Sequence, residues 1–273
     1  MSTGSIKRRL TGFIVPACLL VIWQTAAGLG WVNPQILPSP LAVLGKWWAY
    51  LLPTEAHSPE TGSYLKWLFS GELIHDAISS LYRVLLGFFI GGGLALPLGL
   101  AMGASNRVYS LMNPLVQVLR PIPPIAYIPL SILWFGLGNP PAVFLIAIGA
   151  FFPVLMNTIA GVRHVDSIYI RAARNLGVRN RDLFLRVMLP AATPYILAGA
   201  RIGMGTAFIV VIVSEMIAVN NGLGFRILEA REYFWSDKII AGMLTIGLLG
   251  LLIDTGMSKL NHHLLRWHRG LES

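Results

Sequence analysis

Long apolar runs separated by short polar connections dominate the chain. A helix of about 20 predominantly apolar residues crosses the hydrocarbon core of a bilayer. Runs near this length lie at residues 11–32, 81–104, 111–136, 141–161, 191–219 and 238–258. The pattern predicts an all-α integral membrane protein with six transmembrane helices.

The third run cannot form one regular helix. It contains the proline-rich sequence RPIPPIAYIP at positions 120–129. A proline inside a helix removes a hydrogen-bond donor and clashes with the preceding turn. We therefore expect a helix that ends near Leu119, then an irregular stretch, and then a second short helix that continues through Leu137.

The first run has two interpretations. A basic N-terminus, here MSTGSIKRRL, followed by apolar residues is typical of a secretory signal peptide and also of a first transmembrane helix. The run over 11–32 is long for the apolar part of a signal peptide, and Thr25-Ala26-Ala27 is a weak cleavage site. We therefore expect residues 1–32 to form an N-terminal tail and an uncleaved first transmembrane helix.

Basic residues in the connections indicate the orientation, because cytoplasmic loops carry an excess of Lys and Arg. With the N-terminus in the cytoplasm, thirteen basic residues fall on the inner side: Lys7, Arg8, Arg9, Arg107, Arg163, Arg171, Arg174, Arg179, Arg181, Arg186, Lys259, Arg266 and Arg269. Five fall on the outer side: Lys46, Lys66, Arg226, Arg231 and Lys238. The distribution predicts that both termini are cytoplasmic, that residues 33–80 form an external loop, and that residues 259–273 form a cytoplasmic tail.

Composition agrees with a membrane protein. Of the 273 residues, 55% are hydrophobic and 12% are charged, whereas soluble domains have about 25% charged residues. The formal net charge of +9 comes mainly from a shortage of acids. We interpret this charge as membrane topology and expect no nucleic-acid partner. The single cysteine, Cys18, excludes a disulfide within the chain.

The connection at residues 162–190 is rich in arginine and has the pattern of two short helices. Asp166 is a candidate N-cap of the first helix. The apolar and small side chains of this helix share one face: Tyr169, Ala172, Ala173 and Leu176. Gly177 follows at the position where a left-handed residue ends many helices.

A second helix is expected from Asn180, a candidate N-cap, to Pro190, which would end it. Its apolar side chains also share one face: Leu183, Phe184, Val187 and Met188. A basic amphipathic pair of helices is typical of a loop that lies on anionic lipid, and also of a loop that inserts into a groove of another protein. The alanines before the glycine turn permit the close approach that insertion requires.

This loop resembles the EAA loop of ABC-importer permeases, whose pattern is Glu-Ala-Ala, three residues, Gly, nine residues, Ile, one residue and Leu-Pro. Here Ala172-Ala173, Gly177, Val187 and Leu189-Pro190 occupy these positions with the full spacing. Arg171 stands in place of the glutamate, which resembles the sulfonate, taurine and nitrate branch of the family. Other stretches are similar to that branch: ILPSP at 36–40, RPIPPIAYIPLSILWFGLG at 120–138, ARIGMG at 200–205 and GLG at 222–224.

The resemblance implies the type I ABC-importer permease fold, with a five-helix core over 81–258 and a cytoplasmic coupling loop at 162–190. It implies a second copy of the permease in a homodimer, two ATP-binding-cassette ATPase subunits and an external substrate-binding protein, in the bacterial cytoplasmic (inner) membrane. The substrate it implies is a small anion such as a sulfonate, taurine or nitrate. The residues implied in coupling to the ATPase are Arg171, Ala172, Ala173, Arg174, Leu176, Gly177 and Val178.

The sequence contains no motif for catalysis or metal binding. The phosphate-binding pattern G-x-x-x-x-G-K-[ST] is absent, since the only Gly-Lys pair, Gly45-Lys46, precedes Trp47. Neither HExxH nor CxxC occurs. We therefore expect no enzyme activity, catalytic residue, metal site or cofactor in this chain, and we expect ATP and Mg in the partner ATPase. A stand-alone secondary transporter or channel is the alternative function, but such a protein has no use for an EAA-type loop.

Ionisable residues inside the predicted spans are functional candidates, because a charge in a bilayer is costly. They are Arg83, Arg120, Arg201, Glu215 and Asp254. Arg83 and Asp254 are expected near the membrane interfaces, where their charged ends reach water. Arg201 and Glu215 are roughly 21 Å apart along an ideal helix, so each needs a partner on another helix or in the second subunit.

The irregular stretch after Arg120 is a candidate substrate pathway. Backbone without helical hydrogen bonds is tolerated at membrane depth where it lines a cavity or is buried in protein. Arg120 has two interpretations: it attracts an anion, or it ties down the broken helix ends. The residues that we expect at the pathway or its gate are Arg120, Pro123, Pro124, Tyr127 and Glu215.

Overall fold

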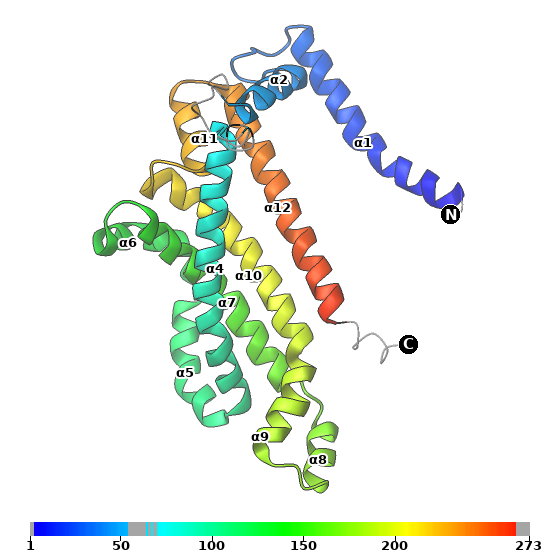
Figure 1. Ribbon diagram of the computed structural model, residues 1–273, viewed down its shortest axis with the longest axis vertical. Coiled ribbons are helices and arrows are strands. Elements are labelled where there is room, and N and C mark those ends of the chain that lie inside the picture. Colours follow the sequence, from blue (N-terminus) through cyan, green and yellow to red (C-terminus); the bar gives the residue numbers. More distant parts are fainter. Residues whose placement is uncertain (1–2, 54–63, 65–66, 68–69, 266–273) are drawn as a thin grey trace. The chain divides into compact units, whose positions relative to one another are not determined.

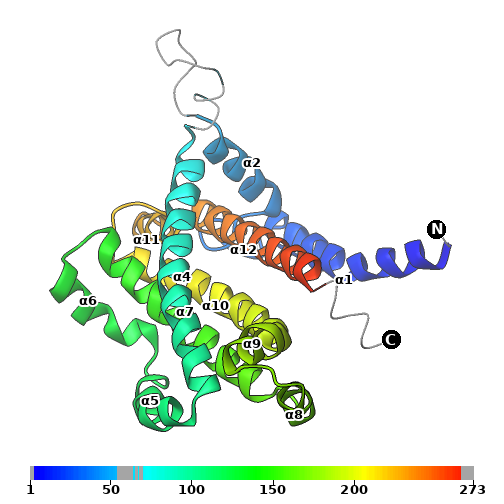
Figure 2. The ribbon, with the colours of Figure 1, turned by 60° about the horizontal axis from the view of Figure 1, so that its bottom comes forward.

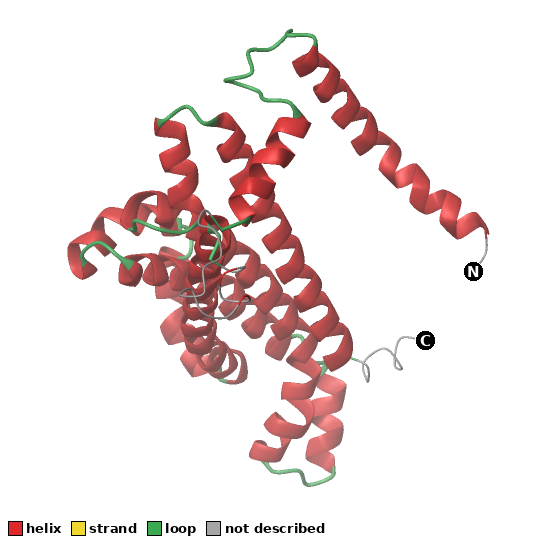
Figure 3. Cartoon of the chain, turned by 45° about the horizontal axis from the view of Figure 1, so that its top comes forward, coloured by secondary structure: helices red, strands yellow, loops and turns green. Residues whose placement is uncertain are grey.

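The computed structural model of the protein is helical and contains no strand over the residues it describes, which are 3–53, 64, 67 and 70–265 (Figure 3). Contacts between residues divide the chain into two compact units. The first consists of Met1–Ala77 and Phe225–Ile246, and the second of Ile78–Gly224 and Gly247–Ser273. The all-α class predicted from the apolar pattern is confirmed.

The second unit is built around two long helices, α7 (Asn139–Arg163) and α10 (Leu189–Ala218), which pack along each other (Figures 1 and 2). Most of α4 (Glu72–Ala104) packs on α7 at such short range that a Cβ atom on Gly91 would lie 2.1 Å from the Ala147 carbonyl oxygen. Glycine therefore permits this approach of the two helices. The apolar core between the helices includes Val84, Leu145, Ile146, Ala150, Ala207 and Val211.

Shorter elements complete the second unit. They are α5 (Asn106–Leu119), the 3-10 turn η2 (Pro124–Tyr127), α6 (Ile128–Phe135), α8 (Ser167–Asn175), α9 (Asn180–Leu183), the π-helical turn η3 (Phe184–Met188) and the later part of α12 (Ser236–Leu264). In Figure 1 the α8–α9 hairpin extends beyond the ends of α7 and α10. The loop predicted from its arginines and its glycine is therefore a protruding feature of this unit.

The first unit contains α1 (Thr3–Gly28), α2 (Pro40–Leu51), most of α11 (Leu223–Glu232) and the start of α12. The Trp47 indole donates a hydrogen bond to the Thr245 hydroxyl at 2.9 Å, and Arg226 forms an ion pair with Asp76 at 2.8 Å. Burial lowers the pKa of the Arg226 guanidinium, but the hydrogen bond with Asp76 and the charges of nearby acids raise this pKa by more. The charged pair therefore ties α11 to the beginning of α4.

Among the described residues, four helices are long and apolar enough to cross a membrane: Glu72–Ala104, Asn139–Arg163, Asn180–Ala218 and Ser236–Leu264. A fifth span is counted if the bent pair α5 and η2–α6 is taken as one. The first predicted run contains a shorter apolar helix, Ile14–Gly28. Four of the six predicted spans therefore have the expected length and composition, and the total of six stays a prediction. The predicted external loop 33–80 and cytoplasmic tail 259–273 lie partly outside the described residues.

The predicted break in the third run is confirmed. α5 ends at Leu119, and the following helical segment is bent from it by 81°. Pro124 and Pro129 stand in the first turns of η2 and α6, where a missing backbone N–H is tolerated. α6 ends at Phe135, slightly before the predicted end at Leu137, because Gly136 leaves the helical region with a φ of 73°.

The predicted end of the second loop helix at Pro190 is wrong. The helical segment that begins at Asn180 continues through η3 into α10 and ends at Ala218. In the π turn, the Leu189 amide donates to the Phe184 carbonyl, which is five residues back. Pro190 then lies in the first turn of α10, a position that does not require an N–H donor.

Candidate coupling loop and translocation pocket

The loop helix α8 has the ends that its sequence predicts. The Asp166 carboxylate accepts a hydrogen bond of 2.9 Å from an amide in the first turn and caps the helix. At the other end Gly177 has a φ of 76°. The amides of Gly177 and Val178 donate to the carbonyls of Arg174 and Ala173, which is the Schellman arrangement. This arrangement places Gly177 in the left-handed region, where a Cβ atom is disfavoured.

The second half of the loop differs from the prediction at its start. Asn180 is the first helical residue and does not cap the helix, because Arg179 already holds the extended backbone of the capping position. The predicted apolar face is directed inward, since Leu183 is buried and Phe184 is partly buried. Both α9 and η3 contact α8, so this face holds α8 against the end of α10.

α8 presents an exposed surface. Ala173 is buried with 8% exposed, whereas Tyr169 and Leu176 are 62% and 83% exposed. Arg171 and Arg174 are exposed as well, and within the described residues neither side chain forms an ion pair or a hydrogen bond. Large apolar side chains beside unpaired cations on a protruding helix are typical of a surface that docks on a partner.

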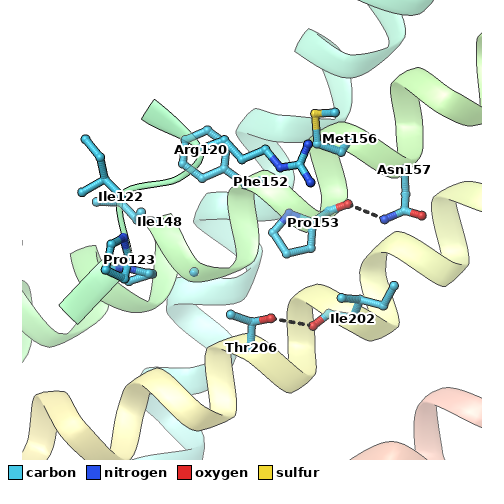
Figure 4. Close-up of a pocket in the computed structure, with 12 residues that line it drawn as sticks. Arg120, Ile122, Pro123, Ile148, Phe152, Pro153, Met156, Asn157, Ile202 and Thr206 are labelled. Atoms are coloured by element: carbon cyan, nitrogen blue, oxygen red, sulfur yellow. Dashed lines mark hydrogen bonds between the residues drawn. The ribbon is translucent and has the colours of Figure 1, made fainter. Parts of the chain in front are cut away.

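A cavity of about 370 Å³ opens beside the broken third span (Figure 4). Arg120, Pro123 and Pro124 of the irregular stretch form one side. The other sides come from α7 and α10 and include Ile148, Phe152, Met156, Asn157, Ile202 and Thr206. The Arg120 side chain extends along the cavity toward Met156 and Asn157 (Figure 4).

Arg120 supplies most of the free hydrogen-bond donors of this cavity. It is the one charged residue among those that line the cavity in the described structure, and there its side chain has neither an ion pair nor a hydrogen bond. The Asn157 amide nitrogen donates to the Pro153 carbonyl at 2.8 Å, and the Thr206 hydroxyl donates to the Ile202 carbonyl at 3.0 Å. One hydrogen of the Asn157 amide is left. The cavity is thus equipped to receive an anion.

The structure brings together three of the five residues predicted for the pathway. Arg120, Pro123 and Pro124 line the cavity, whereas Tyr127 packs against the apolar core of the second unit. Glu215 does not line this cavity and has 0% of its surface exposed. The roles predicted for the five residues stay predictions.

Glu215 accepts three hydrogen bonds in the interior. Its carboxylate accepts from Arg83 Nη1 at 2.6 Å, from the Ser80 hydroxyl at 2.8 Å and from the Gly224 amide at 3.0 Å. Arg83 is 2% exposed. A buried charge persists where it is paired and fully hydrogen-bonded. The prediction that Glu215 needs a partner on another helix is therefore confirmed.

The prediction that the charged end of Arg83 reaches water is wrong, because the residue is 2% exposed. Because α4 begins at Glu72, Arg83 lies about 16 Å along the helix from that end. Glu215 supplies the opposite charge, and Arg83 Nε donates to the Asn139 side chain at 2.7 Å. Arg83 also donates to the backbone and the side chain of Asn221. Arg83 thereby joins α4 to the start of α7 and to the turn after α10.

Two glycines that follow α10 permit close packing against this helix. Gly222 has a φ of 104°, and a Cβ atom there would lie 2.5 Å from the Glu215 carboxylate. A Cβ atom on Gly224 would lie 2.3 Å from the Ile212 carbonyl oxygen. Sequence reasoning missed Ser80, whose hydroxyl bonds to Glu215 although the two residues are 135 positions apart. The one sequence signal that could have indicated this network is the presence of basic and acidic residues within apolar spans.

Arg201 has a partner on another helix, as predicted. Its Nε and Nη2 atoms each donate to a carboxylate oxygen of Asp254 at 2.7 Å. The two side chains are 45% and 52% exposed. Asp254, which was predicted to reach water near an interface, is half-exposed and is also held by this two-bonded pair, which links α10 to α12.

Comparison with known families decides the class of protein to which this loop and cavity belong. The family described as "Binding-protein-dependent transport system inner membrane component" matches residues 93–268. This range contains the broken span, the cavity and the α8–α9 hairpin. The chain belongs to this family. The resemblance drawn from the EAA-type loop is therefore confirmed, and the chain is an integral membrane permease of the ABC-importer class.

Individual relatives cover nearly the whole permease. It is 40% identical to an ABC transporter permease protein of Methanocaldococcus jannaschii, over 93% of this chain and 91% of that protein. It is 35% identical to the aliphatic sulfonates transport permease protein SsuC of Bacillus subtilis (strain 168), over 96% of this chain and 89% of that protein. The second relative belongs to the branch that the sequence resembles.

A solved structure shows the same fold. The permease is similar to a chain of the inward-facing MetNI methionine ABC transporter with a TM-score of 0.63. The match covers 76% of this chain and 99% of that chain at 18% identity. At this identity the likeness concerns the fold alone, and it agrees with the type I importer architecture implied by the resemblance.

Proposed function

We propose that this permease is the transmembrane subunit of an ATP-driven importer, which passes a small anion delivered by an external binding protein. Two copies of the permease form a homodimer that works with two ATPase subunits. The observation that carries the proposal is the protruding α8 helix, which has a fixed glycine turn and an exposed apolar and cationic surface. A channel or a secondary transporter has no use for such a surface.

α8 couples the permease to the ATPase by inserting into a cleft of that subunit. Leu176, with 83% of its surface exposed, supplies the apolar contact, and Arg171 and Arg174 address acidic groups of the partner. The small Ala172 permits close approach, while Ala173 packs against the rest of the loop. Gly177 and Val178 close the turn, so that movement of the ATPase reaches α10 through the hairpin.

In the orientation that we propose, the hairpin and both termini lie in the cytoplasm. The excess of basic residues on that side supports this arrangement. Six spans then cross a bacterial cytoplasmic membrane, with the bent pair α5 and η2–α6 as the third span and α1 as the first. ATP and Mg bind to the ATPase partner, since the sequence of this chain lacks the phosphate-binding pattern.

The substrate is a small anion of the sulfonate, taurine or nitrate kind. The unpaired Arg120 in a cavity beside the broken span supports this charge preference. The relative from Bacillus subtilis is described as a permease for aliphatic sulfonates, which supports the same class. External binding proteins carry much of the specificity in such importers, so the cavity acts after delivery.

Reconstitution tests the function directly. The permease is expressed with its cognate ATPase and binding protein, placed in proteoliposomes, and supplied with labelled sulfonates, taurine or nitrate. We expect uptake that requires both ATP inside and the binding protein outside. Uptake that needs neither, and instead follows an imposed ion gradient, would establish a secondary transporter and overturn the proposal.

A further inference from the structure

We propose that the cavity beside Arg120 binds an organic monoanion with an apolar tail, with the charged head of this ligand at Arg120. The inference rests on the proposed function and names the substrate class that the permease itself selects. It concerns a binding site within the permease, separate from the site of the external binding protein. The relevant structure is the lining of one cavity of about 370 Å³ (Figure 4).

The charges of the lining favour a single negative group. Arg120 is the only charged residue among the lining residues that the structure describes, and its side chain has no partner there. A cation without a counter-charge in a cavity with mostly apolar walls favours an anion that pairs with it. The lining offers no carboxylate to an ammonium group. A zwitterion such as taurine would therefore bring a second charge without a counter-charge.

The apolar walls favour an organic tail. Ile148, Phe152, Met156 and Ile202 face the cavity from α7 and α10, and Pro123 faces it from the irregular stretch. Ligand sites with mostly apolar walls and a few polar groups bury the body of the ligand on the walls and orient it by the polar groups. A small inorganic anion such as nitrate would contact Arg120 and leave these walls unused.

The positions of the side chains assign the two ends of the ligand. The Arg120 guanidinium lies toward Met156 and Asn157, while Pro123 and Ile148 lie at the other end of the cavity (Figure 4). The remaining amide hydrogen of Asn157 is a second donor near the head. The tail therefore extends from the guanidinium toward Ile148.

Equilibrium binding separates this site from the binding protein. The complete permease–ATPase complex is placed in lipid nanodiscs without the binding protein and titrated with unbranched sulfonates of two to six carbons. We expect affinity to rise by up to about fourfold for each added methylene, because each one leaves water for the apolar wall. Nitrate and taurine should compete with hexanesulfonate at least about tenfold more weakly than pentanesulfonate does. Hexanoate in the same assay shows whether the head site accepts a carboxylate as well as a sulfonate.

Variants test the head and the tail separately. Arg120→Leu should weaken binding of all the sulfonates at least about tenfold, through loss of a charge-assisted contact. Arg107→Leu removes a positive charge at the start of α5, the helix that precedes Arg120, and lies outside the cavity, so this variant should bind like the wild type. Ile202→Ser should flatten the dependence on tail length while leaving ethanesulfonate binding almost unchanged.

The outcomes distinguish this site from the proposed function. Equal binding by the Arg120→Leu and Arg107→Leu complexes, or nitrate binding as tight as that of hexanesulfonate, would overturn the site even where ATP-driven uptake with the binding protein is normal. A wild-type complex that shows no ATP-driven uptake of any anion overturns the proposed function. Normal ATP-driven uptake supports the proposed function. A sulfonate affinity that rises with tail length and falls in the Arg120→Leu variant supports the site.

Discussion

At the scale of single residues, the strongest constraint is the buried contact between Arg83 and Glu215. The two charges are 2% and 0% exposed, and their closest atoms are 2.6 Å apart. Each charge is tolerated because the other is present, so the two residues cannot be changed independently. Ser80 and the Gly224 amide complete the coordination of the carboxylate.

Replacing either member of the pair should therefore destabilise the permease. Arg83→Gln leaves a buried carboxylate without its counter-charge, and we expect the free energy of unfolding of the permease to fall by about 3–5 kcal/mol. Glu215→Gln keeps the shape of the side chain but leaves the buried Arg83 cation with the neutral partners Asn139 and Asn221, so we expect a loss of similar size. Thermal melting of the purified complex measures both changes.

Glu232→Gln is the matched control, because Glu232 is exposed at the end of α11 and its neutralisation should leave the melting temperature unchanged. The exchanged variant Arg83→Glu with Glu215→Arg should recover part of the lost stability, since it restores opposite charges. If Arg83→Gln melts together with the wild type, the pair does not hold these helices.

Gly222 lies in the turn after α10, and a substitution there tests how closely this turn packs against Glu215. Gly222→Ala combines an unfavourable φ of 104° with a Cβ atom 2.5 Å from the Glu215 carboxylate, so it should destabilise the protein by at least about 1–2 kcal/mol. Gly247→Ala is the control, because that glycine lies inside α12 with open space around it, and alanine favours a helix. The melting temperature should fall for the first variant alone. Equal melting temperatures would mean that the turn adapts.

At the scale of elements, the proposed coupling role of α8 depends on how the chain turns at the end of this helix. Gly177 has open space around its Cα atom, so a substitution there acts on the backbone and not through a clash. Gly177→Val forces a β-branched residue to a φ of 76° and should displace the end of α8, reducing ATP-dependent uptake at least about tenfold. Membrane insertion should stay normal. Uptake and the amount of ATPase that co-purifies are the two measurements.

Gly177→Asn is the matched control for the turn. Asparagine tolerates the left-handed region far better than valine does. Uptake by the asparagine variant should therefore lie between that of the wild type and that of the valine variant. An equal loss of uptake in both variants would show that the ATPase requires the absence of a side chain at position 177 and not the positive φ.

The sequence predicted this hairpin well because its signals are local. Asp166 caps a helix that starts beside it, and Gly177 ends the same helix, so neither requires knowledge of a distant segment. Pro190 misled the prediction, because a π turn placed it at a tolerated position within a longer continuous helical segment. The failure at Arg83 was different in kind. Its partner is 132 positions away, and only the folded arrangement brings the two together.

The broken third span was predicted only in part from the sequence. Its prolines predicted where the helix stops, and α5 does end at Leu119. They did not predict which side chains would surround the break, because Phe152 and Thr206 reach the cavity from two other helices. The cavity therefore depends on packing between α7 and α10, which a single sequence specifies only through apolar periodicity.

At the scale of the whole molecule, all proposed roles depend on one orientation in the membrane. In the proposed topology the hairpin at 166–190 faces the ATPase, and one crossing of the bilayer by the proposed α10 span separates the hairpin from the segment that follows α10. The basic residues support this arrangement, since thirteen of those counted in the connections fall on the hairpin side and five on the other.

Cysteine labelling tests this orientation in intact cells. In a Cys18→Ser background, Glu232→Cys and Arg179→Cys each place one thiol at an exposed position, the first on the proposed outer side and the second in the hairpin. A membrane-impermeant thiol reagent should label position 232 in intact cells and position 179 only after permeabilisation, because the reagent cannot cross the hydrocarbon core. Labelling of both after permeabilisation is the control for thiol reactivity. Labelling of position 179 but not of position 232 in intact cells would invert the topology. The hairpin would then lie on the side without ATP, and the coupling role of α8 would be excluded.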